Sequence, residues 1–168
     1  ILSLTQAVGV IRARGGELGG DGGRVETSGY VLQVSGISVD TLSPKGRTGD
    51  WLLDPVNITI AASGGNLTPD QLRVGLLTSN VSISTAGSGS AIGVSPTYSA
   101  GAGDITVSGQ IESLSPNSLT LTADNNIIVN SIIAMGGALT LNAGGTINLG
   151  ANILTGGDQT YNGAVNLT

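Results

Sequence analysis

Residues 119–162 read LTLTADNNIIVNSIIAMGGALTLNAGGTINLGANILTGGDQTYN and contain one pattern repeated at an offset of twenty positions. Leu119-Thr120-Leu121 returns as Leu139-Thr140-Leu141. A third copy begins at Thr160, where Gln159-Thr160-Tyr161-Asn162 aligns with Leu139-Thr140-Leu141-Asn142. The same offset relates three further pairs: Ala123 and Ala143, Ile127 and Ile147, and Ile133 and Ile153. A fixed short period is typical of solenoid proteins, in which each repeat buries its apolar side against its neighbours.

The repeat predicts an all-β fold, a right-handed parallel β-helix with coils of about twenty residues and three short strands per coil. Successive coils then stack at a strand spacing of about 4.8 Å. In this register, residues 119, 139 and 159 form one column, and residues 121, 141 and 161 form another. Because side chains alternate along a strand, inward Leu columns place Thr120, Thr140 and Thr160 on the surface.

Two further features of the repeat have a physical interpretation. Thr122, Asn142 and Asn162 share a column, in which stacked side chains can exchange hydrogen bonds along the axis. The pairs Gly136-Gly137 and Gly156-Gly157 recur at the corners, where we expect backbone dihedral angles that a Cβ atom would penalise.

The rest of the chain is less regular, and we treat residues 1–168 as a single β-helix domain. Residues 1–103 are irregular and rich in loops, whereas regular coils occupy 104–168. Short strands are expected at Ile1–Thr5, Val8–Ala13, Gly23–Thr27, Val31–Val34, Asn57–Ala61 and Asn80–Thr85. Residues 43–55 are expected to form a loop, and residues 86–103 form a Gly/Ser-rich excursion.

One short helix is predicted near residues 68–78, against the side of the stack. Thr68 fits the N-cap, Pro69 fits the first helical position, and Gln71 completes a capping box. Leu72 and Leu76 have the spacing of one helix face.

Composition excludes several classes of protein. The chain has no Cys and no His, which excludes the usual zinc, haem and iron–sulfur ligand sets. All six cations lie between Arg12 and Arg73, and the net charge is −5, which argues against nucleic acid and anionic lipid as partners. No apolar run approaches the ~20 residues needed for a membrane span. The chain begins at Ile1 without a signal-like segment, and we expect a mature fragment or an excised piece of a longer protein.

Several segments resemble the filamentous-haemagglutinin-like exoproteins of Gram-negative bacteria, the large secreted partners of two-partner secretion systems. The resemblance lies in GGRVETSG (22–29), SVDT (38–41) and WLLDPVNITI (51–60). It continues in NVSIST (80–85), GDITVSGQI (103–111), LTLTADNNIIVNSII (119–133) and GGALTLNAGGTINL (136–149). It covers nearly the whole chain, and the WLLDP string is its most specific part.

The resemblance implies a right-handed parallel β-helix and export through an outer-membrane transporter to the surface of a Gram-negative bacterium. It also implies an adhesin, haemagglutinin or surface-filament function. The Asn-Pro-rich motif of the family's N-terminal secretion module is not in this chain, which places the chain downstream of that module, in the rod. The excursion at 86–103 is longer than expected for the family.

Several groups of residues allow both a functional and a purely structural interpretation. Trp51 with Asp50 and Asp54 could form a sugar-binding platform, but Trp51 beside two Leu is better explained as a core residue, with Asp54-Pro55 as a turn. Residues 17–26 resemble calcium-binding Gly/Asp turns, although the nonapeptide repeat does not recur. A β-helix polysaccharide lyase or hydrolase would need acids and bases, for which the candidates are Asp40, Lys45, Arg47, Asp50 and Asp54.

Two surface interpretations carry less weight. An ice-binding face needs ranks of Thr-x-Thr, and only Thr120-Leu121-Thr122 has that form. Glycosylation sequons occur at Asn57, Asn66, Asn80 and Asn166, as chance allows in a chain rich in Asn, Thr and Ser.

The sequence therefore predicts a structural rod that is not an enzyme, with no catalytic, cofactor-binding or metal-binding residues and no cofactor. One hypothesis is a secreted adhesin that binds a glycan or protein receptor. The alternative is a subunit that assembles head to tail into a fibre, because the strand-like segments 1–5 and 164–168 lack an evident cap.

Overall fold

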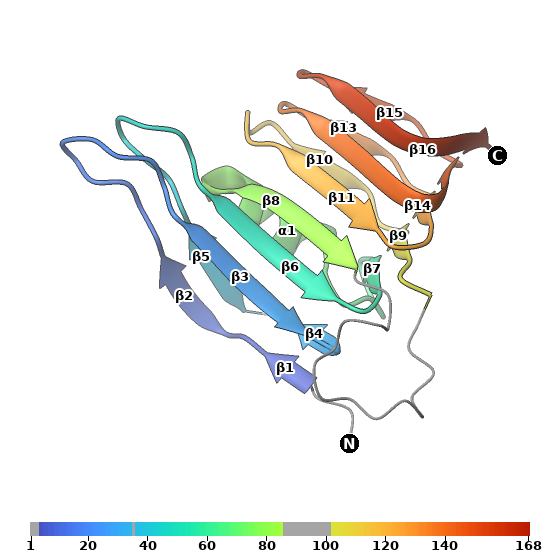
Figure 1. Ribbon diagram of the computed structural model, residues 1–168, viewed down its shortest axis with the longest axis horizontal. Coiled ribbons are helices and arrows are strands. Elements are labelled where there is room, and N and C mark those ends of the chain that lie inside the picture. Colours follow the sequence, from blue (N-terminus) through green and yellow to red (C-terminus); the bar gives the residue numbers. More distant parts are fainter. Residues whose placement is uncertain (1–3, 35, 86–101) are drawn as a thin grey trace.

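The computed structural model describes residues 4–34, 36–85 and 102–168, and these form a mostly β structure with one helix. All strand pairs within this part are parallel, and the strands follow one another along a curled stack (Figure 1). This is a solenoid-like arrangement, as the repeat predicted. The predicted strand residues 1–3 and residues 86–101 of the excursion lie outside the described residues.

The predicted register of the regular coils is confirmed. Leu119 pairs with Leu139, which pairs with Gln159, and Ile127 pairs with Ile147. The strands here are β9 (Ile105–Val107), β10 (Ile111–Ser113), β11 (Leu119–Ala123), β12 (Ile127–Val129), β13 (Ile133–Met135), β14 (Leu139–Leu149), β15 (Ile153–Thr155) and β16 (Gln159–Leu167).

Long strands replace two of the predicted short ones in the last coils. Three short strands per coil would divide residues 139–149 into separate strands at 139–142 and 147–149, but these residues form the single strand β14. It pairs with β11 through its first half and with β12 through its second. A register irregularity between Asn142 and Thr146 marks the bend. Backbone pairing therefore continues around this corner.

The N-terminal part has the same organisation with longer connections. Its strands are β1 (Leu4–Gln6), β2 (Gly9–Arg12), β3 (Arg24–Gly29), β4 (Val31–Gln33), β5 (Ile37–Asp40), β6 (Asp50–Pro55), β7 (Ile58–Ile60) and β8 (Asn80–Thr85). The prediction of a loop over residues 43–55 is wrong for Asp50–Pro55. In that strand Trp51, Leu53 and Pro55 alternate into the interior, and pairing with β3 and β8 overrides the loop-like composition.

The strands succeed one another on three faces. The first face contains β3, β6, β8, β11 and the first parts of β14 and β16, and the second contains β7, β9, β12 and the remainder of β14 and β16. The third face contains β2 and β5 at one end and β10, β13 and β15 at the other. Branched aliphatic side chains from all three faces fill the interior.

The helix α1 (Pro69–Thr78) takes the place of a strand on the third face. The predicted capping box is present: Gln71 N donates to Thr68 Oγ1 at 3.2 Å, and Thr68 N donates to Gln71 Oε1 at 2.8 Å. Leu72 and Leu76 are fully buried, as the spacing predicted. The helix packs against β5 on one side and β10 on the other, so it bridges the gap in the strand stack.

Trp51 anchors α1 to the first face. Its side chain is 1% exposed, and Nε1 donates a hydrogen bond of 3.1 Å to Thr27 Oγ1 on the neighbouring strand. A Cβ atom on Gly75 would lie 2.8 Å from the indole Cζ3, so the helix approaches the ring at the one position where it has no side chain. The sequence-based placement of Trp51 in the core is confirmed, whereas the turn expected at Asp54-Pro55 is strand.

The glycines at the corners are required because the backbone of the neighbouring coil passes close to them, not because of unusual dihedral angles. Neither Gly137 nor Gly156 has a positive φ, so the expected conformational reason is wrong. A Cβ atom on Gly137 would meet the backbone of Asn117, and one on Gly156 would meet Gly136 O at 2.6 Å. Each glycine lets one coil pass against the backbone of the preceding coil.

A polar ladder follows the corner between the first and second faces. Asn57 Oδ1 accepts from Asp104 N at 2.9 Å, and Asp104 Oδ1 accepts from Asn126 N at 3.0 Å. Asn126 Oδ1 in turn accepts from Thr146 N at 2.9 Å and from Thr146 Oγ1 at 3.0 Å. Each side chain thus satisfies the backbone of the next coil, where strand pairing is interrupted.

Removal of one ladder residue tests this role. Asn126→Ala leaves Thr146 without its acceptor in a half-buried corner and is expected to lower the free energy of unfolding by about 1–3 kcal/mol. Urea denaturation measures the loss. Asn130→Ala is the control, because Asn130 is exposed and its side chain makes no hydrogen bond within the described residues. Equal losses in the two variants would contradict the ladder.

The contact between Trp51 and Thr27 gives a second prediction. Thr27→Val leaves the buried indole N–H without an acceptor and is expected to cost about 1–3 kcal/mol, whereas Thr27→Ser retains the hydroxyl and loses less. The chain has a single Trp, so its fluorescence reports the transition directly. A Thr27→Ser variant as unstable as Thr27→Val would show that packing, not the hydrogen bond, dominates.

Candidate functional site

The sugar-binding platform considered as an alternative for Trp51 is not formed. The ring is buried, while Asp50 and Asp54 alternate to the opposite side of β6. An indole that packs against α1 and donates to Thr27 cannot stack on a ligand. The structure therefore separates the aromatic ring from the carboxylates that the sequence placed beside it.

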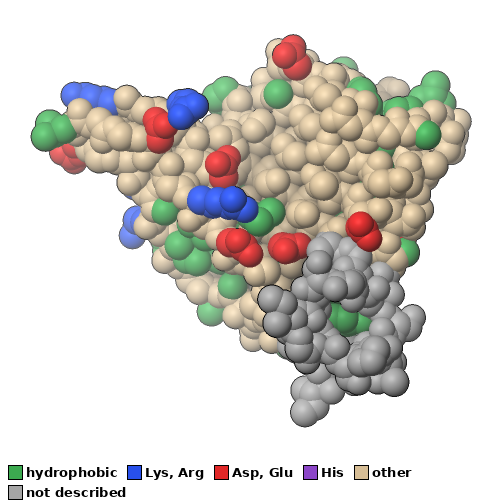
Figure 2. Space-filling model, viewed as in Figure 1, with side chains coloured by type: hydrophobic (Ala, Val, Ile, Leu, Met, Phe, Trp, Pro, Cys, Tyr) green, Lys and Arg blue, Asp and Glu red, His purple; other side chains and the backbone are tan. Residues whose placement is uncertain are grey.

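The outward surface of the first face consists largely of hydroxyl and amide side chains. Asn142 Nδ2 donates to Thr122 Oγ1 at 3.0 Å, and Asn162 Nδ2 donates to Asn142 Oδ1 at 2.7 Å, which confirms the predicted ladder. Thr120, Thr140 and Thr160 occupy the adjacent column in register. Figure 2 shows this face with few charged or hydrophobic groups over β11 and β14.

A shallow groove crosses the charged end of the same face. It has a volume of about 260 Å³. Arg24, Asp50, Leu52, Asn80, Val81, Ser82, Ser118 and Thr120 line it. Asn80 is fixed on both sides: its Nδ2 donates to Thr48 O at 3.1 Å, and its Oδ1 accepts from Ser118 N at 3.1 Å. The groove offers hydroxyl, amide and charged groups on a rigid sheet, which suits a polar ligand more than an apolar one.

Two stacked loops, residues 13–23 and 41–49, project from the N-terminal end of the stack (Figure 1). Arg47 Nη2 lies 2.8 Å from Asp21 Oδ2, and Arg47 N donates to Asp21 Oδ1 at 2.9 Å. These contacts, the backbone hydrogen bond first, lower the pKa of Asp21, and the carboxylate raises the pKa of Arg47. The calcium-like segment 17–26 thus uses its central carboxylate to hold the neighbouring loop.

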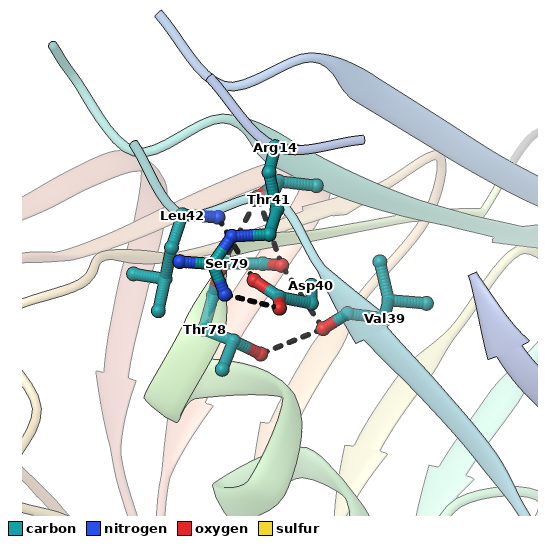
Figure 3. A network of polar contacts seen from close by, with 7 residues as sticks. All are labelled: Arg14, Val39, Asp40, Thr41, Leu42, Thr78 and Ser79. Carbon is teal, nitrogen blue, oxygen red and sulfur yellow. Dashed lines mark hydrogen bonds and ion pairs between the residues drawn. The ribbon is translucent and has the colours of Figure 1, made fainter. Parts of the chain in front are cut away.

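Asp40 belongs to a polar network at the end of α1, seen in Figure 3. Its Oδ2 lies 2.8 Å from Arg14 Nη1, and its Oδ1 accepts from Leu42 N at 3.2 Å. The next residue, the fully buried Thr41, donates to Ser79 Oγ at 2.9 Å. The network ties α1 to β5 and gives these groups structural partners.

The candidate acids and bases of an enzyme are not brought together. Asp40 pairs with Arg14, Arg47 pairs with Asp21, and Asp50 lies on the first face. Lys45 lies in the projecting loop at 41–49 and makes no ion pair within the described residues. Residues 4–34, 36–85 and 102–168 contain no group of three or more acidic, His or Cys side chains placed to hold a metal.

The asparagines of the four sequons differ in which side-chain atom, Nδ2 or Oδ1, is hydrogen bonded. Asn80 Nδ2 donates to Thr48 O, and Asn166 Nδ2 donates to Asn148 Oδ1 at 3.1 Å. Asn57 and Asn66 are held through Oδ1, which accepts from backbone N–H groups. A glycan on Asn80 would break a contact between coils.

The third face carries exposed apolar residues that sequence reasoning did not single out. Leu114 is 99% exposed and Leu154 is 57% exposed. Leu114 falls between the repeated strands, at Ser113-Leu114-Ser115, so the alternating pattern alone marks it as an outward position.

Comparisons with protein-family models, curated proteins and solved structures find no significant match to this chain. Within the part of the chain that the structure describes, no helix is long and apolar enough to cross a membrane.

The contact between Asp21 and Arg47 predicts a pH dependence. Because folding lowers the pKa of Asp21 from its ordinary value of 3.8, its stabilising contribution is complete above that value. The contribution is lost as the pH falls through the lower folded pKa. Asp21→Asn is therefore expected to lower the melting temperature at pH 7 and to match the unmodified chain in strong acid.

Thermal melts followed by circular dichroism measure this difference. Asp158→Asn makes the same change of charge at an exposed carboxylate that forms no ion pair within the described residues. It is expected to leave the melting temperature nearly unchanged at pH 7. A difference between Asp21→Asn and the unmodified chain that persists below the folded pKa would contradict this assignment.

Proposed function

We propose that the chain is a rod segment of a secreted Gram-negative surface protein of the filamentous-haemagglutinin-like kind. In this proposal the curled stack is a right-handed parallel β-helix, exported through the outer-membrane transporter of a two-partner secretion system. The rod presents its sides for attachment to a host, another cell or a surface, through a glycan or protein receptor.

The observation that carries the proposal is the in-register stack of the first face. Strands β3, β6, β8, β11, β14 and β16 pair continuously from Arg24 to Leu167. A continuous ladder distributes tension over many backbone hydrogen bonds, and its outward side presents hydroxyl and amide groups in fixed columns. Rigidity and an extended polar surface are properties that an attachment rod requires, whereas catalysis requires convergent groups in a pocket.

The groove beside Asp50 is the best-defined polar contact surface of this face. Asp50 and Arg24 are exposed, and Leu52 offers an apolar patch between Glu26 and Ser82. Carboxylate, guanidinium and hydroxyl groups are suited to the hydroxyls of a glycan, and an aliphatic side chain can cover one side of a sugar ring. A glycan receptor is therefore favoured over a purely apolar partner.

The second candidate is a subunit that stacks end to end into a fibre. Within the described residues β16 pairs with β14 alone, and Val165 and Leu167 on β16 are 43% and 84% exposed. An unpaired parallel edge accepts a further strand, either from the same polypeptide or from a second copy. Electron microscopy distinguishes fibres from separate particles.

A bead assay tests the adhesin. Fluorescent beads coated with the 168-residue chain are expected to attach to epithelial cells or to spots of a glycan array, and excess free chain should compete. Ser82→Trp fills the groove and is expected to reduce attachment at least tenfold, whereas Thr140→Trp, on the same face outside the groove, should not. Absence of attachment to every cell and glycan would contradict the proposal.

A further inference from the structure

Strand β16 contains a dipeptide that occurs nowhere else in the sequence. Asn162 is followed by Gly163, whereas every other asparagine is followed by a residue with a side chain. The backbone nitrogen that follows an asparagine can attack the side-chain amide, and a side chain on the next residue hinders this approach. Because glycine has no Cβ atom, Asn162 has the least hindered neighbour of all the asparagines in the chain.

The strand register is interrupted at this dipeptide. The pairing of β14 with β16 passes from Asn142–Asn162 directly to Thr146–Ala164, so Gly163 has no partner in register. Its φ is +146°, which residues with a side chain rarely adopt, and a Cβ atom there would lie 3.0 Å from Ala143 O. Gly163 therefore lies outside the register that fixes the other residues of β16.

The dipeptide is also accessible. Strand β16 lies at the end of the stack (Figure 1), and within the described residues it pairs with β14 alone. Asn162 and Gly163 are both exposed, whereas Asn142 is half-buried on β14, which has strands on both sides. A strand that is paired on one side opens locally at a lower free energy than one that is paired on both. Water and hydroxide can therefore reach this amide.

One hydrogen bond holds the Asn162 side chain. Its Nδ2 donates to Asn142 Oδ1 at 2.7 Å, and its Oδ1 accepts no hydrogen bond within the described residues. The Asn142 side chain is held at both ends, because its Nδ2 also donates to Thr122 Oγ1 at 3.0 Å. Asn162 is thus the last and least restrained member of the ladder.

We propose that Asn162 is a site of spontaneous deamidation. The deprotonated backbone nitrogen of Gly163 attacks Cγ of Asn162 and forms a C–N bond. Nδ2 leaves as ammonia, which takes up one proton to replace the one lost from the backbone nitrogen, and a succinimide ring remains. Water then adds to either carbonyl of the ring and gives aspartate or isoaspartate at position 162. This reaction does not depend on the function proposed above.

The reaction weakens the end of the ladder. A carboxylate is ionised at neutral pH and has no hydrogen to donate, so it lies unpaired against Asn142 Oδ1. Isoaspartate also adds an atom to the backbone of β16, which disturbs the alternation of the side chains that follow. The first face gains one negative charge, and its last strand is less firmly held.

Peptide mapping by mass spectrometry tests the site. The chain is incubated at 37 °C near neutral pH and at mildly alkaline pH, denatured, and cut before Asp158 with endoproteinase Asp-N. Isoaspartate is expected as residues 158–168 heavier by about one dalton, and aspartate as a new cleavage before position 162. Both products should form faster at the higher pH, because the attacking nitrogen must be deprotonated. Asn142 and Asn166 are internal controls and should react at least tenfold more slowly.

Two variants separate the effect of sequence from that of structure. Ala143→Gly creates the same dipeptide on β14, and position 142 should still react at least tenfold more slowly than Asn162. Asn162→Gln keeps an amide but requires a larger ring, and it should abolish the change in residues 158–168. Circular dichroism checks that both variants are folded. An unmodified chain without reaction at Asn162, or equal rates at positions 142 and 162 in folded Ala143→Gly, overturns the proposal.

Discussion

Parallel backbone pairing between successive coils is the constraint on which the rest of the structure depends. Each strand of the first face bonds to the strand one coil earlier and the strand one coil later, so an inward residue in one coil fixes an inward position in the next. The aliphatic columns, the Asn and Thr ladders and the close glycine contacts all follow from this register. A shift of one residue in any coil would turn its apolar side chains outward.

The helix shows how the stack accommodates a departure from this rule. On the third face α1 separates β5 from β10, and strand pairing stops on both sides of it. Side-chain hydrogen bonds replace the missing backbone ladder, through Thr41, Ser79 and Asn117. Trp51 fills the space beneath the helix because Gly75 leaves room for the ring.

The faces of the stack consequently differ in chemistry. On the first face, outward Asn and Thr side chains hydrogen bond to one another along their ladders. The polar groups available to a ligand lie mainly in the groove near Arg24 and Asp50. The third face has an apolar outward side around Leu114 and Leu154. The two faces therefore offer different chemistry to whatever contacts them.

The sequence by itself determined the coil period, the register of Leu119 over Leu139, the Asn ladder and the capped helix, because these depend on local spacing and on contacts between identical positions of neighbouring repeats. Only the tertiary structure decided that Asp50–Pro55 is a strand and that α1 replaces a strand. It also decided that Gly137 is needed because the backbone of Asn117 passes close to it. It also decided which side chains of the irregular half meet, such as Asp21 and Arg47. In that half the connections between strands vary in length, so sequence spacing no longer specifies which residues become neighbours.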